Sequence, residues 1–227
     1  MFAGDSMAIS RTGGLPDPVL GRRSTAFLTI DMQYLDAHRD FGVGETYRLA
    51  GNTAEIDPYF TRLEDIVVPN IVRLHEACRS AGVPLIHVRI MGRAGDGSDF
   101  SWRFKELGYL VPPGTKDAEI LSELSPQDGE VIINKTTAGA FNSTEIDSIM
   151  RRMGIDTLIV AGVTTNSCVE TTVRDAGDRD YRVIVVEDAC AAMDHEEHES
   201  SLRFLHRNFA VVQSTEDVIA QLARIAD

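Results

Sequence analysis

The sequence predicts an α/β fold in which a parallel sheet is covered on both faces by helices. Several short segments are apolar at every residue, and helical patterns separate them along the chain. A strand that is apolar on both sides must be buried on both faces, and parallel strands need a crossover between them. No repeat or linker interrupts this alternation, so we expect one domain over residues 24–227, preceded by a Gly-, Pro- and Ser-rich arm over residues 1–23.

The first half of the domain shows two strands and one helix. Residues 24–31 (STAFLTID) and 83–90 (VPLIHVRI) are the apolar runs expected of strands. Residues 61–82 have helical periodicity, with Gly82 as the residue after the helix end and Pro69 either at a kink or in the first turn. The irregular stretch after residue 90 is rich in Gly and Pro and too long for a simple connection, which favours a functional loop.

The second half continues the alternation of strands and helices. Asn142 with Glu145, and Asp194 with Glu197, have the spacing of helix capping boxes. A further helix is expected to follow Cys168, which lies in its first turn, and a last one is expected over residues 215–225. The remaining strands are expected over residues 130–135, 157–162, 181–188 and 210–214.

The composition limits the partners of the protein. The 35 acidic and 22 basic residues of the 227-residue chain give a net charge of −13, and no cluster of Lys or Arg occurs. Such a chain is expected to bind neither nucleic acid nor an anionic membrane surface, and we interpret the charge as a source of solubility. Its partner is expected to be a small molecule.

Cysteine usage and the N-terminus bear on the compartment. Three cysteines are too few, and odd in number, for a disulfide framework, which favours a reducing compartment. The first 23 residues have no apolar core of signal-peptide length, and no stretch approaches a membrane span. We therefore expect a cytoplasmic protein.

Three reactive side chains lie at predicted strand ends. Asp31 closes the first strand, Lys135 closes the third, and Cys168 lies just beyond the fourth. In an open α/β sheet the site lies outside the carboxyl ends of the strands, so these side chains are expected to converge. A nucleophile, an acid and a base together are what nucleophilic catalysis needs.

Each of these residues also has a structural interpretation. Asp31 could cap a turn, Lys135 could be a solvated strand end, and a free cysteine such as Cys168 is most often a small buried apolar side chain. Taken together, at three ends of one sheet, they favour a catalytic site.

Cys168 is the best candidate for a nucleophile among the three thiols. It is placed in the first turn of a helix, where the helix dipole and free N–H groups favour a thiolate of low pKa. Cys78 falls on the apolar stripe of the helix over residues 61–82 and is expected to pack in the core, and Cys190 follows a strand without further signals.

The segments AFLTIDMQ, INKTTAGAF and GVTTNSCVETTVRDAGDRDYRVIVVEDAC resemble the isochorismatase-like cysteine hydrolases. This resemblance runs from about residue 24 to the C-terminus. It implies the isochorismatase-like hydrolase fold, a doubly wound three-layer α/β/α sandwich with a six-stranded, mainly parallel sheet. It also implies a catalytic triad, which falls on Asp31, Lys135 and Cys168, and assembly as a dimer or tetramer.

The resemblance further implies the geometry of the oxyanion hole. The family has a non-proline cis peptide four residues before the nucleophile, which here would join Val163 to Thr164. It turns the N–H of Thr164 toward the same point as the N–H of Cys168, so that two backbone donors could stabilise an oxyanion.

The implied activity is hydrolysis of a C–N bond. Isochorismatases that cleave a vinyl ether lack the cysteine, so Cys168 favours an amidohydrolase acting on a small ureide or N-carbamoyl compound through a thioester. A carboxamide hydrolase of the nicotinamidase type is the alternative. A redox-sensing thiol protein and a non-catalytic binding module on the same fold are alternatives of other classes.

No cofactor is expected. Metal-containing nicotinamidases carry an Asp-x-His well after the catalytic Asp, whereas the Asp-x-His found here, Asp36 with His38, follows Asp31 by only five residues. His87 is interpreted as a core histidine inside a strand. No nucleotide-binding glycine motif occurs, so we predict neither a metal nor a nucleotide.

The residues that contact substrate are the least determined part of the prediction. Each candidate could equally be a core aromatic or a surface polar residue. Gln33 and Tyr34 follow Asp31, Arg89 lies near the end of a strand, and the long loop supplies Trp102 and Phe104. The expected substrate-binding residues are Gln33, Tyr34, Arg89, Trp102, Phe141 and Asn166, with Phe104 as a further residue covering the site.

Overall fold

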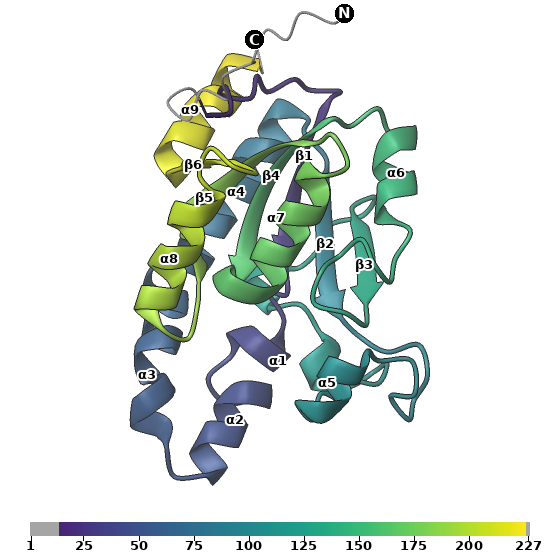
Figure 1. Cartoon of the computed structure of the whole chain (residues 1–227), viewed down its shortest axis with the longest axis vertical. Helices are drawn as coiled ribbons and strands as arrows, with labels where there is room; N and C mark the ends of the chain where they lie inside the picture. The colour runs from purple at the N-terminus through teal and green to yellow at the C-terminus, as the bar shows by residue number, and fades with distance from the viewer. Residues whose placement is uncertain (1–13, 226–227) are drawn as a thin grey trace, which may run out of the picture.

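Six parallel strands form one sheet in the computed structural model of the chain, which describes residues 14–225 (Figure 1). Their spatial order is β3-β2-β1-β4-β5-β6, and every neighbouring pair is parallel. This confirms the predicted doubly wound sheet. The strands are β1 Thr25–Ile30, β2 Leu85–Ile90, β3 Val131–Lys135, β4 Thr157–Val163, β5 Arg182–Ala191 and β6 Val211–Gln213.

The order of the strands reverses between β1 and β4. The chain first builds outward from β1 through β2 to β3, then returns to place β4 on the other side of β1. Ile30 at the end of β1 pairs with Val88 on one side and with Gly162 on the other. Crossovers therefore leave these two neighbouring strands in opposite directions, which opens a crevice outside their carboxyl ends.

Helices cover both faces of the sheet and complete the three-layer sandwich (Figure 1). Along β1, Phe27 and Leu28 point into opposite cores, and every residue of this strand is buried. This explains why its sequence is apolar throughout. One face is covered by α6 (Ile146–Arg152), α7 (Glu170–Gly177) and α8 (His195–Leu205), and the other by α3 (Thr53–Arg62), α4 (Val68–Ala81) and α9 (Thr215–Ile225).

The helix predicted over residues 61–82 is the second half of a longer helical segment. The segment begins with α3 and runs through a π-helical turn, Leu63–Val67, into α4. Pro69 lies in the first turn of α4, where a missing N–H costs little. Gly82 ends the helix with φ = 68°, the left-handed conformation predicted for it.

Several short helices gather at the carboxyl edge of the sheet and were not predicted. They are α1 (Tyr34–Ala37), α2 (Gly42–Leu49) and α5 (Trp102–Glu106), and Figure 1 shows them below the arrowheads of the strands. The long loop after β2 also contains 3-10 turns at Lys116–Ala118 and Ser122–Leu124. The loop after β2, which was predicted to be functional, is therefore folded and covers one edge of the sheet.

One of the two predicted capping boxes is present. The side chain of Asp194 accepts a hydrogen bond from the N–H of Glu197 at 2.9 Å and caps α8, as predicted. The box at Asn142 is wrong, because α6 begins only at Ile146. The side chain of Asn142 instead donates to Asp175 on α7. A contact with a residue distant in the sequence therefore replaces the cap that the local pattern predicted.

Strand β5 extends to Ala191, beyond its predicted end at residue 188. Cys190 consequently lies inside the strand and is fully buried, rather than following it. In the described part of the N-terminal arm, the N–H of Leu15 donates to the backbone oxygen of Arg207. The start of this part therefore contacts the segment that follows α8. The rest of the predicted arm lies outside the described residues.

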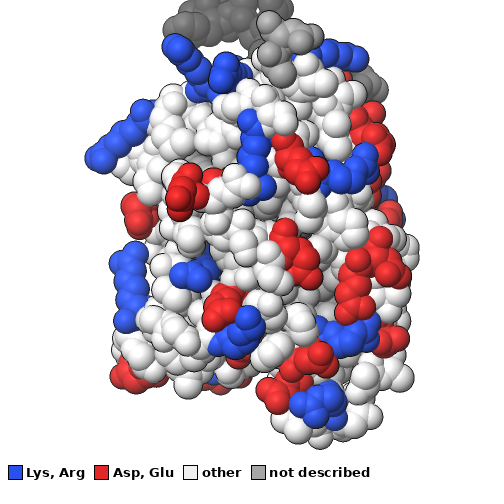
Figure 2. Space-filling model, turned by 180° about the vertical axis from the view of Figure 1, so that it is seen from behind, with Lys and Arg blue, Asp and Glu red and all other residues white. Residues whose placement is uncertain are grey.

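The charged residues are mixed over the surface. On the face shown in Figure 2, basic and acidic side chains are interspersed. Within residues 14–225, no helix combines the length and the apolar character that crossing a bilayer requires.

The close approach of β1 and β4 depends on Gly162. This residue has φ = 120°, and a Cβ atom there would overlap the carbonyl oxygen of Ile30. We predict that Gly162→Ala lowers the free energy of unfolding by at least about 3 kcal/mol, measured by urea denaturation. Gly95→Ala is the matched control, since a Cβ there meets no atom within 4 Å. Equal, small effects of both variants would contradict this account.

Candidate active site

The three predicted catalytic residues lie at the carboxyl edge of the sheet. Asp31 follows β1 directly and has φ = 52°, a left-handed conformation that Asp tolerates better than most residues. Lys135 is the last residue of β3, and Cys168 lies in a π-helical turn, Thr165–Val169, between β4 and α7. Asp31 and Cys168 therefore flank the point where the strand order reverses.

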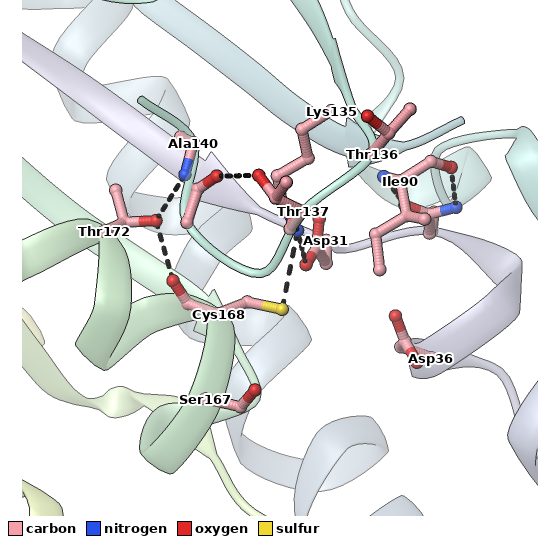
Figure 3. Close-up of polar contacts among 12 residues, drawn as sticks. Asp31, Asp36, Ile90, Lys135, Thr136, Thr137, Ala140, Ser167, Cys168 and Thr172 are labelled. Atoms are coloured by element: carbon pink, nitrogen blue, oxygen red, sulfur yellow. Dashed lines mark hydrogen bonds and ion pairs between the residues drawn. The ribbon is translucent and has the colours of Figure 1, made fainter. Parts of the chain in front are cut away.

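The three side chains meet in the interior (Figure 3). The Nζ atom of Lys135 lies 2.8 Å from Oδ2 of Asp31 and 3.4 Å from Sγ of Cys168, and it also donates to the carbonyl oxygen of Thr137 at 3.0 Å. The side chains of Lys135 and Asp31 are fully buried. Because β2 separates β3 from β1, a long side chain such as lysine is needed to span this gap.

Hydrogen bonds hold the segment after β3 against the turn that carries the thiol. The hydroxyl of Thr172 donates to the carbonyl oxygen of Cys168 at 2.7 Å and accepts from the N–H of Ala140 at 3.1 Å. Thr137 donates to the carbonyl oxygen of Gly139 at 2.8 Å. Lys135 and Cys168 thus belong to two segments that are tied to each other (Figure 3).

Burial dominates the electrostatics of this group. It raises the pKa of Asp31, and Lys135 opposes this shift only in part. Burial alone lowers the pKa of Lys135, but the negative charges beside it, Asp31 first, outweigh burial and raise its pKa. Lys135 therefore remains a cation, as the neighbour of two acidic groups should.

The predicted low pKa of Cys168 is wrong. Burial raises the pKa of this thiol, the negative charge of Asp31 raises it further, and the attraction of Lys135 does not compensate. The helix-start position was the basis of the prediction, but desolvation of the sulfur outweighs it. The resting site consequently holds a neutral thiol beside a lysine–aspartate ion pair.

Asp31 can accept the proton of that thiol. Oδ2 is within ion-pair distance of Lys135, yet neither carboxylate oxygen accepts a hydrogen bond of good geometry from the described residues. A buried carboxylate with unused acceptor capacity beside a neutral thiol is suited to general-base chemistry.

The thiol opens into a small cavity of about 200 Å³. Its wall combines the turn after β4 with the loop segments at the sheet edge. The lining residues are Asp36, Arg103, Phe104, Tyr109, Thr164, Asn166, Ser167, Cys168, Met193 and Glu197. The peptide bond between Val163 and Thr164 is cis, as the resemblance implied.

Of the six predicted substrate-binding residues, Asn166 lines this cavity, where its side chain donates to Glu197. Phe104, the further predicted residue, also lines it and is buried, with Nζ of Lys135 5.6 Å from the centre of its ring. Trp102 is three-quarters exposed on α5, outside the cavity lining.

Two predicted polar contacts are used inside the protein. The amide of Gln33 donates to the carbonyl oxygens of Ile90 and Asp117 and accepts from the N–H of Ile90, so it ties the end of β1 to the end of β2. Arg89 donates to Asn134 and to the carbonyl oxygen of Ala118. Both side chains hold the edge of the sheet together instead of lining the cavity.

Two predicted aromatic contacts belong to the core. Tyr34 is buried and stacks against His38, with ring centres 4.9 Å apart. Phe141 is buried and packs near Tyr181, at 5.9 Å. Neither ring lines the cavity.

The sequence analysis missed most of the remaining wall. Asp36 was considered only as part of a metal motif, although its position five residues after Asp31 was a usable signal. Tyr109 and Arg103 come from the long loop, Met193 lies just before α8, and Glu197 lies in its first turn. No local pattern indicates which of these side chains turn inward.

The histidines considered for a metal site lie apart from the cavity lining. His87 is buried and its Nε2 is 3.0 Å from a carboxylate oxygen of Glu130, while His38 packs against Tyr34 and Phe41. Over residues 14–225, no group of three or more His, Cys, Asp or Glu side chains is arranged to hold a metal ion.

The fold and the site place the chain among the doubly wound α/β proteins with a reactive group at the switch point of the sheet. Residues 59–217 match the Isochorismatase domain family. The chain therefore belongs to the isochorismatase family of hydrolases.

Individual relatives agree with this assignment. N-carbamoylsarcosine amidase of Arthrobacter sp. is 31% identical over 163 residues, which are 70% of this chain and 62% of the amidase. Ureidoacrylate amidohydrolase RutB of Agrobacterium fabrum is 30% identical over 192 residues, 77% of this chain and 79% of RutB. The chain thus spans less than two thirds of the amidase, and it spans 56% of the uncharacterised family member YwoC of Bacillus subtilis.

A solved structure shows the same fold. A cysteine hydrolase from Pseudomonas syringae pv. phaseolicola 1448A superposes with a TM-score of 0.77 at 28% identity, covering 93% of this chain and all of that chain.

The buried ion pair generates a prediction about stability. Lys135→Met leaves the Asp31 carboxylate buried without its cation, so we expect the free energy of unfolding at pH 8 to fall by about 3–5 kcal/mol. In the unfolded chain Asp31 keeps a pKa of about 4, whereas burial holds its folded pKa higher. Wild type and variant lose stability together as the pH rises from about 4 to the folded pKa of Asp31 in the wild type, because the folded carboxyl is protonated in both. The deficit therefore opens above that pKa, where Lys135 stabilises the carboxylate of the wild type alone, and it is small below it.

Urea denaturation between pH 3 and 8 measures this effect. The control is the double variant Asp31→Asn/Lys135→Met, which removes both charges and should recover most of the loss at high pH. A deficit in Lys135→Met that is independent of pH would mean that lost packing, not the unpaired carboxylate, destabilises the protein.

The raised pKa of Cys168 generates a second prediction. Alkylation by iodoacetamide requires the thiolate, so without substrate its rate should reach half its maximum above about pH 8.5, the ordinary pKa of a cysteine. Modification of Cys168 is followed by mass spectrometry, with Cys168→Ser as the background for Cys78 and Cys190. A rate that is already maximal and constant from pH 6 to 8 would contradict a neutral resting thiol.

Proposed function

We propose that this chain is a cysteine-dependent amidohydrolase that cleaves a C–N bond of a small ureide or N-carbamoyl compound through a covalent thioester. The observation that carries the proposal is the contact of Lys135 with both Asp31 and Cys168, together with the position of Cys168 in the wall of a small cavity. A nucleophile, a base and a fixed cation in one buried group are the parts that acyl transfer requires.

In the first step Asp31 takes the proton of the Cys168 thiol as the sulfur attacks the substrate carbonyl carbon. This order suits a thiol of raised pKa, because no free thiolate has to exist before substrate is bound. The carbonyl oxygen becomes an oxyanion, for which the N–H groups of Thr164 and Cys168 serve as donors. Lys135 stabilises the negative charge that moves between carboxylate and sulfur.

In the second step the tetrahedral intermediate collapses and the C–N bond breaks. The protonated Asp31 gives its proton to the departing nitrogen, which leaves as ammonia or an amine, and the acyl group remains on sulfur. Water then attacks the thioester while Asp31 takes its proton, and Cys168 leaves as a thiol after the proton returns. Asp31 thus alternates between base and acid, and the enzyme ends in its initial state.

The size of the cavity and the relatives support the proposed substrate class. A cavity of about 200 Å³ accepts a molecule of few heavy atoms, such as a ureide. Relatives named as an N-carbamoylsarcosine amidase and a ureidoacrylate amidohydrolase support C–N hydrolysis of N-carbamoyl compounds. A homo-oligomer in the cytoplasm remains our expectation for the assembled protein.

An ammonia-release assay tests this function. The panel comprises ureidoacrylate, N-carbamoylsarcosine, biuret, triuret, nicotinamide and maleamate. We expect turnover of at least one of the first four, and at least about 100-fold slower turnover in Cys168→Ser and in Asp31→Asn, since a serine hydroxyl is too weakly acidic for Asp31 to activate. Preferred turnover of nicotinamide would instead support the carboxamide alternative.

Mass spectrometry of a rapidly quenched reaction identifies the nucleophile. An acyl or carbamoyl adduct should map to Cys168 and be absent from Cys168→Ser. An adduct on Cys190, or near-normal turnover by Cys168→Ser, would show that the nucleophile has been chosen wrongly. Oxidation of Cys168 without release of ammonia from any compound would favour the redox-sensing alternative.

A further inference from the structure

Asp36 is a second buried carboxylate beside the thiol, and the reaction steps above do not use it. It belongs to α1, the single helical turn that follows Asp31, and it is 4% exposed while lining the catalytic cavity. Figure 3 shows Asp36 and the sulfur of Cys168 in one view, and both residues line the same cavity. A buried acid in this position needs a physical explanation, because burial of an unpaired charge is unfavourable.

Hydrogen bonds hold Asp36 in place without neutralising it. The hydroxyl of Tyr109 donates to Oδ1 at a long 3.4 Å, and the hydroxyl of Tyr59 donates to the backbone oxygen at 3.0 Å. Among the residues described, the ion pairs do not include Asp36, and the second carboxylate oxygen accepts no side-chain hydrogen bond. The carboxylate thus keeps unused acceptor capacity in a residue that lines the cavity.

The charges around Asp36 make its ionised form costly in the empty site. Burial, and then the negative charge of Asp31, raise the pKa of Asp36 to about 7, and Lys135 opposes this only in part. Hydrogen-bond donors brought by a ligand would stabilise the carboxylate, because each donor replaces part of the lost hydration. The structure therefore favours a ligand that carries N–H groups and no negative charge at this point.

Another part of the cavity wall, formed by Thr164 and Cys168, has the complementary character. The proposed oxyanion donors, the N–H groups of Thr164 and Cys168, suit the carbonyl oxygen of a substrate. A urea or amide bound by that oxygen directs its N–H bonds away from it, toward acceptors. Asp36 is the buried acceptor available there, since Glu197, the other carboxylate of the wall, is exposed and already accepts from Asn166.

We infer that Asp36 is a substrate-binding residue that accepts hydrogen bonds from the N–H groups of a urea or amide and so selects ureide-type substrates over carbonyl compounds without N–H. The inference rests on the proposed function and names what the same site recognises. Tyr109 acts as the positioning residue that orients the carboxylate.

The test compares a substrate with N–H groups to one without them. Its probes are biuret, or whichever ureide of the panel the wild-type protein hydrolyses fastest, and p-nitrophenyl acetate. This activated ester is expected to acylate the same thiol and has no N–H donor. The variants are Asp36→Asn, of nearly the same size, and Asp36→Ala. The matched control is Asp40→Asn, which removes an exposed carboxylate just after α1.

We expect kcat/KM for the ureide to fall by about 10- to 100-fold in Asp36→Asn and further in Asp36→Ala, the range for loss of a charge-assisted hydrogen bond. For p-nitrophenyl acetate, after subtraction of the Cys168→Ser background, the fall should be less than about 3-fold. Asp40→Asn should leave both values within about 2-fold. Retained ester turnover also shows that the variants are folded and that the triad is intact.

The remaining outcomes separate this inference from the proposed function. Equal losses on both probes would show a structural role for Asp36 and overturn the inference, as would unchanged ureide turnover in Asp36→Asn. A wild-type protein that cleaves the ester but releases ammonia from no compound of the panel would contradict the proposed function, and the selection of ureides with it.

Discussion

The buried ion pair between Lys135 and Asp31 is the interaction on which the rest of the site depends. Two charges 2.8 Å apart with no exposure to solvent are stable only if each satisfies the other. The same pair surrounds Cys168 with one positive and one negative neighbour, so that a proton can leave the sulfur without creating a new net charge in the interior. The contact between Lys135 and Asp31 thus both stabilises the buried charges and allows the thiol to give up its proton.

The topology of the sheet makes this contact possible. Asp31 and Cys168 are brought together because β1 and β4, far apart in the sequence, are neighbours where the strand order reverses. Lys135 comes from β3, beyond β2, and reaches the pair only through the length of its side chain. Gly162 allows β4 to approach β1 closely just before the turn that carries the thiol.

The sequence predicted the framework well because burial on both faces leaves a simple signal. All six strands were found, and the side chains at three of their ends identified Asp31, Lys135 and Cys168, which the structure brings together. What failed depended on contacts distant in the sequence. Asn142 was assigned to a helix cap but bonds to Asp175. Gln33, predicted to contact substrate, donates to the carbonyl oxygen of Ile90, a contact that the local sequence does not indicate. The pKa of the thiol was misjudged because helix position is visible in a sequence and desolvation is not.

The division between sheet and loops has a consequence for how such a protein can change over evolutionary time. The proposed triad is supplied by strand ends and the adjoining turn, whereas Asp36, Arg103 and Tyr109 are supplied by segments that pack at the edge of the sheet. Loops tolerate substitution and insertion far better than buried strands do. Changes in the segments that line the cavity can therefore alter the substrate preference while the residues at the strand ends stay the same. In this way one ancestral reaction can be adapted to many nitrogen compounds.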